Sequence, residues 1–195
     1  MPYKDKEKQK EFQRKHHLKN KAKYRKGLQN RRARNKEYAY ALKMECSCGE
    51  TNKACLDFHH ENNKIKSVAQ FIRDAVCLET LQKEIDKCKV ICGNCHQKQH
   101  NPLVIEDGSN WLNFPKGRIE KRRWFIKFIS GLKCESCIEN DSRCLEFHHF
   151  EVKRFAISYL LTSGHSLDYL KEEITRCKIL CTNCHRKLHS MVDMV

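Results

Sequence analysis

Cysteine and histidine are the side chains of this sequence best suited to chemistry, and most of them recur at one fixed offset. The chain has 195 residues, with 13 cysteines and 11 histidines. Residues 48–100 align without a gap on residues 137–189, with 20 identities over 53 positions. The chain therefore contains a tandem duplication. The recurring pairs, first copy and then second, are Cys48/Cys137, Cys55/Cys144, His59/His148, His60/His149, Cys88/Cys177, Cys92/Cys181, Cys95/Cys184, His96/His185 and His100/His189.

Two cysteine pairs in each copy have the spacing of a structural zinc site. Two tight turns, each supplying two thiolates, can surround one tetrahedral zinc ion. Only one residue separates Cys46 from Cys48, so we expect a distorted site or an additional ligand in copy one. Buried free thiols are the alternative interpretation. The expected zinc ligands are Cys46, Cys48, Cys92 and Cys95 in copy one and Cys134, Cys137, Cys181 and Cys184 in copy two.

The histidines exceed the needs of a four-thiolate zinc site. His185 and His189 are four residues apart in an expected helix and share one face of it. His148 and His149 end an expected strand, where alternation points adjacent side chains in different directions. Three imidazoles around one point with a fourth beside them would form an open metal site with a base. The alternatives are a wider zinc-binding surface and histidines buried in a small core.

Each copy has the same expected order of elements around these side chains. A cysteine turn precedes a short strand, which is 56–60 in copy one. An amphipathic helix follows, because apolar residues recur at intervals of three, four and three from Leu78 to Cys88. A second cysteine turn then leads into the histidine-bearing helix. Residues 119–132 also have a helical apolar stripe, and we expect this helix to pack on the zinc end of copy two.

These elements predict a small zinc-stabilised α+β protein with a basic N-terminal arm. The expected divisions are an arm at 1–43, the first module at 44–100, a linker at 101–118, a helix and the second module at 119–189, and a tail at 190–195. Zinc would offset the shortage of apolar core, since structural metal contributes folding free energy directly.

The basic charge is concentrated in the arm. Residues 1–43 hold 11 lysines and 5 arginines against 4 acidic residues, within a chain of net charge +15. We expect one long solvated helix, or two helices broken near Gly27. One-signed charge of this kind favours an arm that binds nucleic acid; the alternative is a solubilising tail. The candidate nucleic-acid contacts are Arg14, Lys15, Lys19, Lys23, Arg25, Lys26, Arg31, Arg32 and Arg34.

Composition excludes other classes of protein. Hydrophobic residues make up 39% of the chain, and no apolar run approaches the roughly 18 residues that a membrane span requires. Residues 1–43 contain no apolar stretch typical of a secretory signal. We therefore expect an intracellular protein in a reducing compartment such as cytoplasm, nucleoid or organelle, with no membrane partner. Metal-bound thiolates are then favoured over disulfides.

The order of these motifs resembles the HNH endonucleases, particularly their zinc-containing phage- and intron-borne branch. The resemblance rests on Leu145-Glu146-Phe147-His148-His149 and on the run from Cys181 to His189, and on their counterparts in copy one. It covers nearly the whole chain and implies two ββα-metal modules, each with two strands and a helix around one divalent ion. It leaves open whether the protein is a homing enzyme, a packaging nuclease or a host protein.

The resemblance also implies roles for individual histidines. His148, His185 and His189 take the places of metal ligands, with His189 alternatively contacting phosphate, and His149 takes the place of the general base. In copy one the ligands are His59, His96 and His100, and the base is His60. The catalytic ion would be Mg²⁺ or another divalent metal. The family's central asparagine, which orients the base, is replaced here by Arg176 and Lys87, so we expect another orienting group or weakened catalysis.

The expected function is hydrolysis of DNA phosphodiester bonds, as nicking or double-strand cleavage. The two modules would let a monomer cut double-stranded DNA without a second chain. Copy two is expected to be the more active, because both of its cysteine turns have regular spacing. The alternative is a zinc-stabilised protein that binds DNA or RNA, with one or both nuclease sites inactive.

Overall fold

A computed structural model describes residues 6–101 and 115–192 of the chain. It shows an α+β protein with two small two-stranded sheets, one in each copy of the repeat. Most of the predicted linker, 102–114, and the last residues of the predicted tail, 193–195, lie outside the described residues.

Both copies contain the same succession of elements. A 3₁₀ turn leads into a strand, two helices, a second strand and a final helix. In copy one these are η1 (Lys53–Cys55), β1 (Leu56–His60), α2 (Val68–Asp74), α3 (Leu78–Ile85), β2 (Cys88–Cys92) and α4 (Gly93–His100). In copy two they are η3 (Ser142–Cys144), β3 (Leu145–His149), α6 (Ile157–Thr162), α7 (Leu167–Ile174), β4 (Cys177–Cys181) and α8 (Thr182–Val192).

The chain divides into two compact units that do not coincide with the two copies. The first unit contains residues 1–43 and 58–89, and the second contains 44–57 and 90–195. The division passes between Asp57 and Phe58 in β1 and between Lys89 and Val90 in β2. The zinc turns of both copies therefore belong to the second unit.

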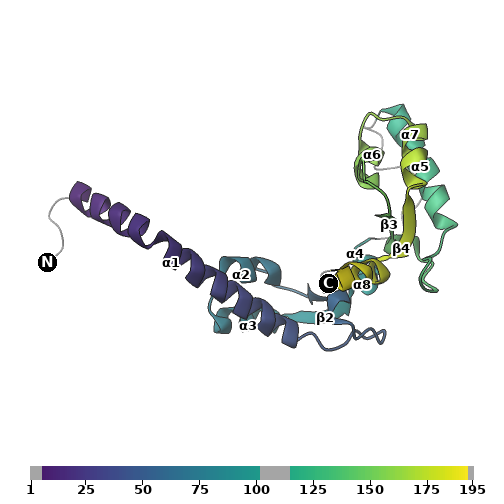
Figure 1. Cartoon of the computed structure of the whole chain (residues 1–195). Coiled ribbons are helices and arrows are strands. Elements are labelled where there is room, and N and C mark those ends of the chain that lie inside the picture. The colour runs from purple at the N-terminus through teal and green to yellow at the C-terminus, as the bar shows by residue number, and fades with distance from the viewer. Residues whose placement is uncertain (1–5, 102–114, 193–195) are drawn as a thin grey trace. The chain divides into compact units, whose positions relative to one another are not determined.

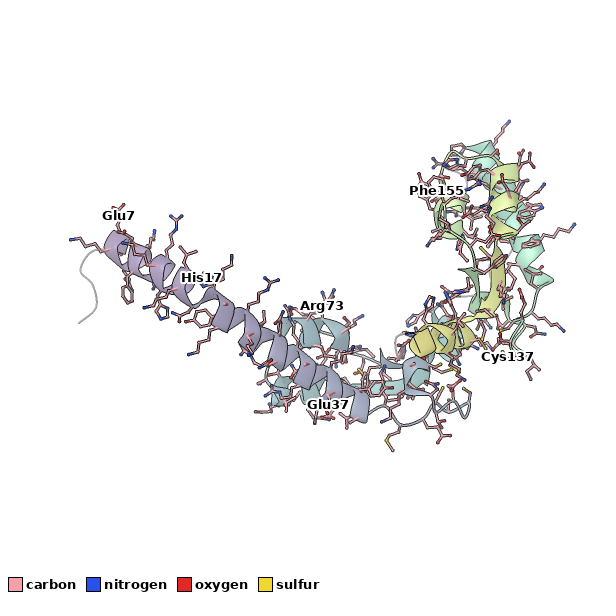
Figure 2. All side chains as sticks on the ribbon, viewed as in Figure 1. Glu7, His17, Glu37, Arg73, Cys137 and Phe155 are labelled. Atoms are coloured by element: carbon pink, nitrogen blue, oxygen red, sulfur yellow. The ribbon has the colours of Figure 1, made fainter. Side chains whose placement is uncertain are left out.

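The N-terminal segment is one uninterrupted helix, α1 (Lys6–Ala41), without a break at Gly27. Side chains from 6 to 27 are exposed except at Asn20, which is half-buried. Figure 2 shows them projecting around the helix between Glu7 and His17. A helix whose side chains are polar on all sides has no face to bury, so this part of α1 matches the solvated arm expected from the sequence.

The C-terminal part of α1 belongs instead to a packed core. Ala39 is buried with Val68, Phe71, Leu81 and Ile85. The last four belong to α2 and α3, which lie beside the end of α1 (Figure 1). From the sequence we expect Tyr38 and Leu42 to belong to a short helix packed on the zinc end of copy one. In the structure they belong to the end of α1 and pack on the core of α2 and α3 instead.

Polar contacts fix α1 against the end of α2. The Arg32 Nε donates to the Arg73 carbonyl (2.7 Å), and the buried Asn35 Nδ2 donates to the Val76 carbonyl (2.9 Å). Arg73 is labelled beside α1 in Figure 2. Arg32, a candidate nucleic-acid contact from its charge, therefore stabilises the helix pair as well, because helix C-termini leave carbonyls without intrahelical donors.

In copy two the corresponding layer is formed by α5 (Lys116–Ser130). Trp124, Phe125 and Phe128 pack on the core of α6 and α7 around Leu160 and Leu170. Only Ile129 and Leu132 contact the core around the zinc turns. The predicted helix 119–132 is present, but most of its apolar face covers the α6–α7 pair rather than the zinc end.

The second helix of each pair carries a side chain into the site region. α7 begins at its N-cap Ser166, whose hydroxyl accepts from the Tyr169 amide, and it buries Leu170, Glu173 and Ile174 on one face. The apolar spacing predicted this helix, but the helix ends at Ile174, so that Cys177 is the first residue of β4. β3 and β4 pair antiparallel, with His149 opposite Cys177 and Leu145 opposite Cys181.

Candidate metal centres

The four cysteines of the second copy converge at the end of its sheet. The Sγ atoms of Cys134, Cys137, Cys181 and Cys184 all lie within 4.8 Å of one another. The Cys181 amide donates to the Cys134 sulfur (3.1 Å). Burial alone would raise the pKa of the Cys134 thiol, but backbone hydrogen bonds outweigh burial and lower it. Four converging sulfurs with amide donors form a donor set that fits tetrahedral zinc.

The four cysteines of the first copy converge equally well. The Sγ atoms of Cys46, Cys48, Cys92 and Cys95 also lie within 4.8 Å of one another. Although the turn between Cys46 and Cys48 is one residue shorter, these four sulfurs can complete a zinc site without a further ligand from the described residues. Two clusters in the chain can hold structural zinc.

Gly49 allows the shorter turn to close. In copy one the Cys46 amide donates to the Glu50 carbonyl (2.9 Å), and in copy two the Cys134 amide donates to the Glu139 carbonyl (2.8 Å). The same closing bond thus spans one residue fewer in copy one. Gly49 has φ +87°, a conformation that residues with a Cβ rarely adopt. The glycine was a local signal for this turn that the cysteine spacing alone did not give.

Three histidines of copy two form a separate cluster in the same unit as the cysteine clusters. Nitrogen atoms of His148, His185 and His189 lie within 4.8 Å of one another, and the three ring-centroid separations are 4.8–5.1 Å. Burial and the charges that His185 and His189 would carry lower the pKa of His148. A lowered pKa favours the neutral imidazole, which is the form that binds metal.

A carboxylate that the sequence interpretation missed holds one of these rings. Glu146 Oε2 lies 2.5 Å from His185 Nδ1, and Thr182 Oγ1 donates to Glu146 Oε1 (2.8 Å). Such carboxylate–imidazole contacts fix the ring and its tautomer, leaving the other nitrogen for a metal. Strand alternation contained the signal, since Glu146 is two residues before His148 and therefore lies on the same face.

His149 points to a different partner from that of His148, as strand alternation predicted. Its Nε2 lies 3.0 Å from Oε1 of Glu173, which is 1% exposed. The amides of Arg154 and Phe155 also donate to this carboxylate. Burial raises the pKa of Glu173, but these hydrogen bonds outweigh burial and lower it. An ionised carboxylate only accepts, so His149 donates through Nε2. In the neutral form of the ring this contact leaves the lone pair on Nδ1.

Copy one repeats this contact. His60 Nε2 lies 2.9 Å from Glu84 Oε1, and Glu84 is 2% exposed. Burial raises the pKa of Glu84, but hydrogen bonds from Lys87, Ile65 and His60 outweigh burial and lower it to about 2. Glu84 and Glu173 were the missed residues here. Their signal was an identical carboxylate on the buried face of both amphipathic helices.

The two positions where the resemblance calls for asparagine have other contacts. Lys87 Nζ donates to Glu84 Oε2 (2.8 Å), and Arg176 lies 3.4 Å from Glu172. Lys87 therefore supports the carboxylate that holds His60, whereas Arg176 forms a surface ion pair.

The remaining histidines of copy one are divided between the two units. In the second unit the rings of His96 and His100 have centroids 4.9 Å apart, and His96 Nδ1 lies 3.1 Å from Asp57 Oδ2. His59 is buried at 8% exposure and belongs to β1 in the first unit. In copy two, by contrast, all three clustered histidines lie in the second unit.

A groove of about 900 Å³ opens beside the histidines of copy two. His149, His185 and Glu146 line it, together with the basic residues Arg122 and Lys153. Its position leaves His149 accessible to a ligand despite the burial of most of the ring. An anionic substrate is compatible with this lining, because the basic side chains face the same space as the imidazoles.

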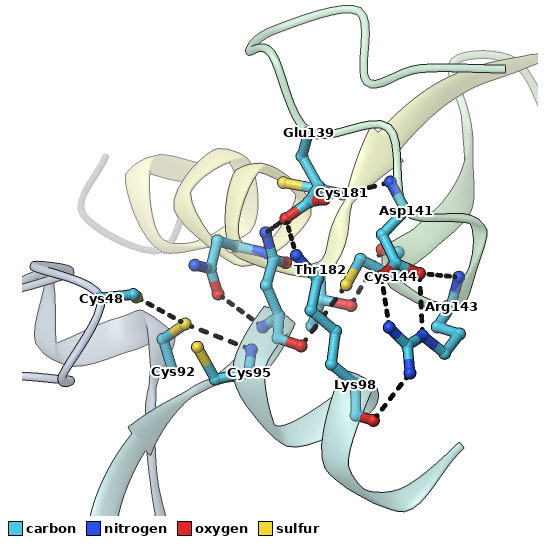
Figure 3. A network of polar contacts seen from close by, with 12 residues as sticks. Cys48, Cys92, Cys95, Lys98, Glu139, Asp141, Arg143, Cys144, Cys181 and Thr182 are labelled. Carbon is cyan, nitrogen blue, oxygen red and sulfur yellow. Dashed lines mark hydrogen bonds and ion pairs between the residues drawn. The ribbon is translucent and has the colours of Figure 1, made fainter. Parts of the chain in front are cut away.

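The two copies contact each other through their zinc turns and final helices, all within the second unit. The backbone amide of Asn94 donates to Asn183 Oδ1 (3.2 Å), and the backbone amide of Asn183 donates to Asn94 Oδ1 (3.1 Å). Glu139 accepts from Lys98 (2.8 Å), and its repeat equivalent Glu50 accepts from Lys187 (2.7 Å). Figure 3 shows Lys98, Glu139 and Arg143 in this network. The contacts therefore have approximate two-fold symmetry.

Two further cysteines belong to this interface and not to the zinc clusters. The Cys55 thiol donates to the Asn183 carbonyl and the Cys144 thiol to the Asn94 carbonyl, both at 3.4 Å. Burial raises the pKa of Cys55 to about 11 and that of Cys144 to about 12. Neither thiol belongs to a four-cysteine cluster, and both are buried, so their role is in packing and hydrogen bonding at the interface.

No protein-family model, curated protein or solved structure matches the chain. Among residues 6–101 and 115–192, no helix has the length and apolarity needed to cross a membrane.

We predict that the purified chain contains about two zinc ions, one in each four-cysteine cluster. Metal analysis after removal of weakly bound ions gives the stoichiometry. Cys95→Ser and Cys184→Ser should each reduce the content to about one, because each removes one ligand from a different cluster. Cys77→Ser, at an exposed cysteine outside both clusters, is the matched control and should retain two. A wild-type content near zero would contradict the zinc assignment.

Proposed function

We propose that the protein is a metal-dependent endonuclease of the HNH type that hydrolyses DNA phosphodiester bonds. One observation carries this proposal. A three-histidine metal-binding cluster in copy two adjoins a fourth histidine, His149, whose ring is fixed by the buried Glu173. The same histidine–glutamate contact recurs in copy one. A purely structural metal site does not require a polarised histidine beside it.

The residues of copy two divide the chemistry among them. His148, His185 and His189 would hold the ion, and Glu146 orients His185. A divalent cation there would stabilise the charge that develops on the phosphate and on the leaving 3′ oxygen. His149 accepts a proton at Nδ1 from the attacking water, and Glu173 stabilises the imidazolium that results. Glu173 is the orienting group that the sequence lacks at Arg176.

The donor set favours a transition metal over Mg²⁺. Three imidazole nitrogens suit ions such as Ni²⁺ or Zn²⁺ best, and Mn²⁺ less well. Mg²⁺ strongly prefers oxygen ligands in octahedral geometry. Mg²⁺ is the weaker alternative, because the three ligand atoms that the cluster offers are all nitrogens.

DNA is the proposed substrate because of α1. Its exposed segment carries six of the candidate contacts, and a basic helix without an apolar face fits a polyanion better than a protein groove. Hydrolysis of DNA at the two proposed sites needs no nucleotide cofactor. Two modules in one chain give one candidate site for each strand of a duplex.

We predict that supercoiled plasmid is cleaved in Mn²⁺ and more slowly in Mg²⁺. His149→Ala should reduce cleavage at its site by about 10²–10⁴-fold, because it removes the general base. His60→Ala should do the same for copy one. If both sites cut, each single variant converts linearisation into nicking, and time courses on agarose gels distinguish these products. His165→Ala is the matched control, since His165 has no histidine counterpart in copy one and should leave the products unchanged.

Full cleavage by the His60→Ala, His149→Ala double variant would overturn the proposed general bases. Binding of DNA without cleavage in any divalent metal would instead favour the nucleic-acid-binding protein. The earlier expectation that copy two is the more active is tested by comparing the two single variants.

We predict that residues 6–26 of α1 supply salt-dependent affinity without affecting the chemistry. The tested change replaces six exposed residues with glutamine: Arg14, Lys15, Lys19, Lys23, Arg25 and Lys26. If these contact about six phosphates, the slope of log K against log salt should fall by roughly five. Fluorescence anisotropy on a DNA duplex measures the slope. Residues 28–41 are kept intact because Ala39 is part of a core. An unchanged slope would show that the segment is a solvated tail.

A further inference from the structure

The two copies hold equivalent carboxylates in different ways. In copy two, Thr182 Oγ1 lies within hydrogen-bonding distance of both Glu146 Oε1 (2.8 Å) and the Cys144 carbonyl (3.2 Å). Glu146 in turn holds His185. The residue equivalent to Thr182 in copy one is Gly93. Copy one has no hydroxyl at this position to hold Asp57, its equivalent of Glu146.

Arg186 of copy two supplies these contacts to copy one. Its Nη1 donates to Asp57 Oδ2 (2.9 Å) and to the Cys55 carbonyl (3.2 Å). Asp57 and Cys55 are the repeat equivalents of Glu146 and Cys144, so the guanidinium reaches the same two acceptors that the hydroxyl of Thr182 reaches in copy two. The equivalent of Arg186 in copy one is Gln97, which accepts from Asn101 (2.5 Å). At this position a side chain of copy two therefore supports copy one, whereas its counterpart Gln97 bonds to the neighbouring Asn101.

Gly93 provides the room for this guanidinium. A Cβ atom at Gly93 would lie 3.2 Å from Arg186 Cζ and 2.6 Å from Thr182 Cγ2. Real Cβ atoms do not approach another carbon as closely as the second distance, because dense packing leaves no such overlap. The two copies differ at two positions here, Gly93 against Thr182 and Gln97 against Arg186. These differences are linked, because Gly93 both lacks the hydroxyl that Arg186 replaces and leaves the room that Arg186 and Thr182 occupy.

The contact extends to a candidate metal ligand. Asp57 Oδ2, which accepts from Arg186, also lies 3.1 Å from His96 Nδ1. The Asp57 carboxylate therefore joins the Arg186 guanidinium to the His96 ring. That carboxylate accepts from Nδ1–H and leaves the lone pair of His96 on Nε2, the arrangement that outer carboxylates impose on metal-binding histidines.

We infer that Arg186 is a positioning residue for His96, so that copy two holds a candidate metal ligand of copy one. Copy two holds its own His185 through Thr182 and has no such dependence on copy one. The inference rests on the proposed metal-binding role of His96. It makes the two modules of the chain functionally unequal for a reason other than their cysteine spacing.

The first test observes His96 directly in the full-length, zinc-loaded chain. ¹⁵N NMR of the imidazole nitrogens should show Nδ1–H and unprotonated Nε2 in the wild type. Arg186→Ala should move His96 toward a mixture of tautomers. Lys187→Ala is the matched control, because it breaks the neighbouring interface pair with Glu50 without touching Asp57. Unchanged His96 resonances in Arg186→Ala, or equal changes in both variants, would overturn the inference.

The second test separates the two sites. His148→Ala removes a ligand of copy two, so that the remaining Mn²⁺ affinity outside the zinc clusters reports copy one. Adding Arg186→Ala to this variant should weaken that affinity by about 10-fold or more. In a His100→Ala background, which removes a candidate ligand of copy one and therefore reports copy two, Arg186→Ala should leave the affinity unchanged. Weakening confined to copy two, or equal in both backgrounds, would contradict the inference.

These readouts distinguish the inference from the proposed nuclease activity. If the wild-type protein binds Mn²⁺ but cuts no DNA, the proposed function fails while the affinities still decide the role of Arg186. If DNA is cut and His96 is unaffected by Arg186→Ala, only the role of Arg186 is rejected.

Discussion

Convergence of four thiols at the end of each small sheet is the constraint on which the rest of the structure depends. A two-stranded sheet with short helices buries too little apolar surface to be stable alone. The Cys92–Cys95 and Cys181–Cys184 turns join a strand to the helix that carries two histidines. Zinc at these turns would therefore contribute folding free energy and also set the direction of the histidine-bearing helices.

The same turns bring the two copies together. Asn94 and Asn183, which the sequence placed inside the cysteine turns, exchange hydrogen bonds across the interface. They therefore do not act beside the histidines. The duplication thus preserves an association between modules as well as the modules themselves. The approximate symmetry breaks where Gly93 faces Thr182 and Arg186, and this break gives the copies unequal support for their candidate ligands.

The sequence predicted those features that depend on spacing. The cysteine turns, the helical histidine pair His185 and His189, and the opposed directions of His148 and His149 follow from the periods of helix and strand. Helix spacing marked Glu173 as a carboxylate on the buried face of α7, but it could not reveal the partner His149, because that contact between α7 and β3 is tertiary. Tyr38 and Leu42 marked a packed face at the end of α1, but spacing could not reveal that this face covers α2 and α3, because that contact is tertiary.

The proposed chemistry of copy two depends most on Glu173, which would hold His149 as the proton acceptor. The most direct measurement is single-turnover nicking of plasmid in Mn²⁺ by Glu173→Gln in a His60→Ala background, where only copy two cuts. Loss of the charge should lower the cleavage rate by about 10–100-fold, with zinc content and DNA affinity unchanged. Nicking at the full rate of the His60→Ala parent would contradict the claim.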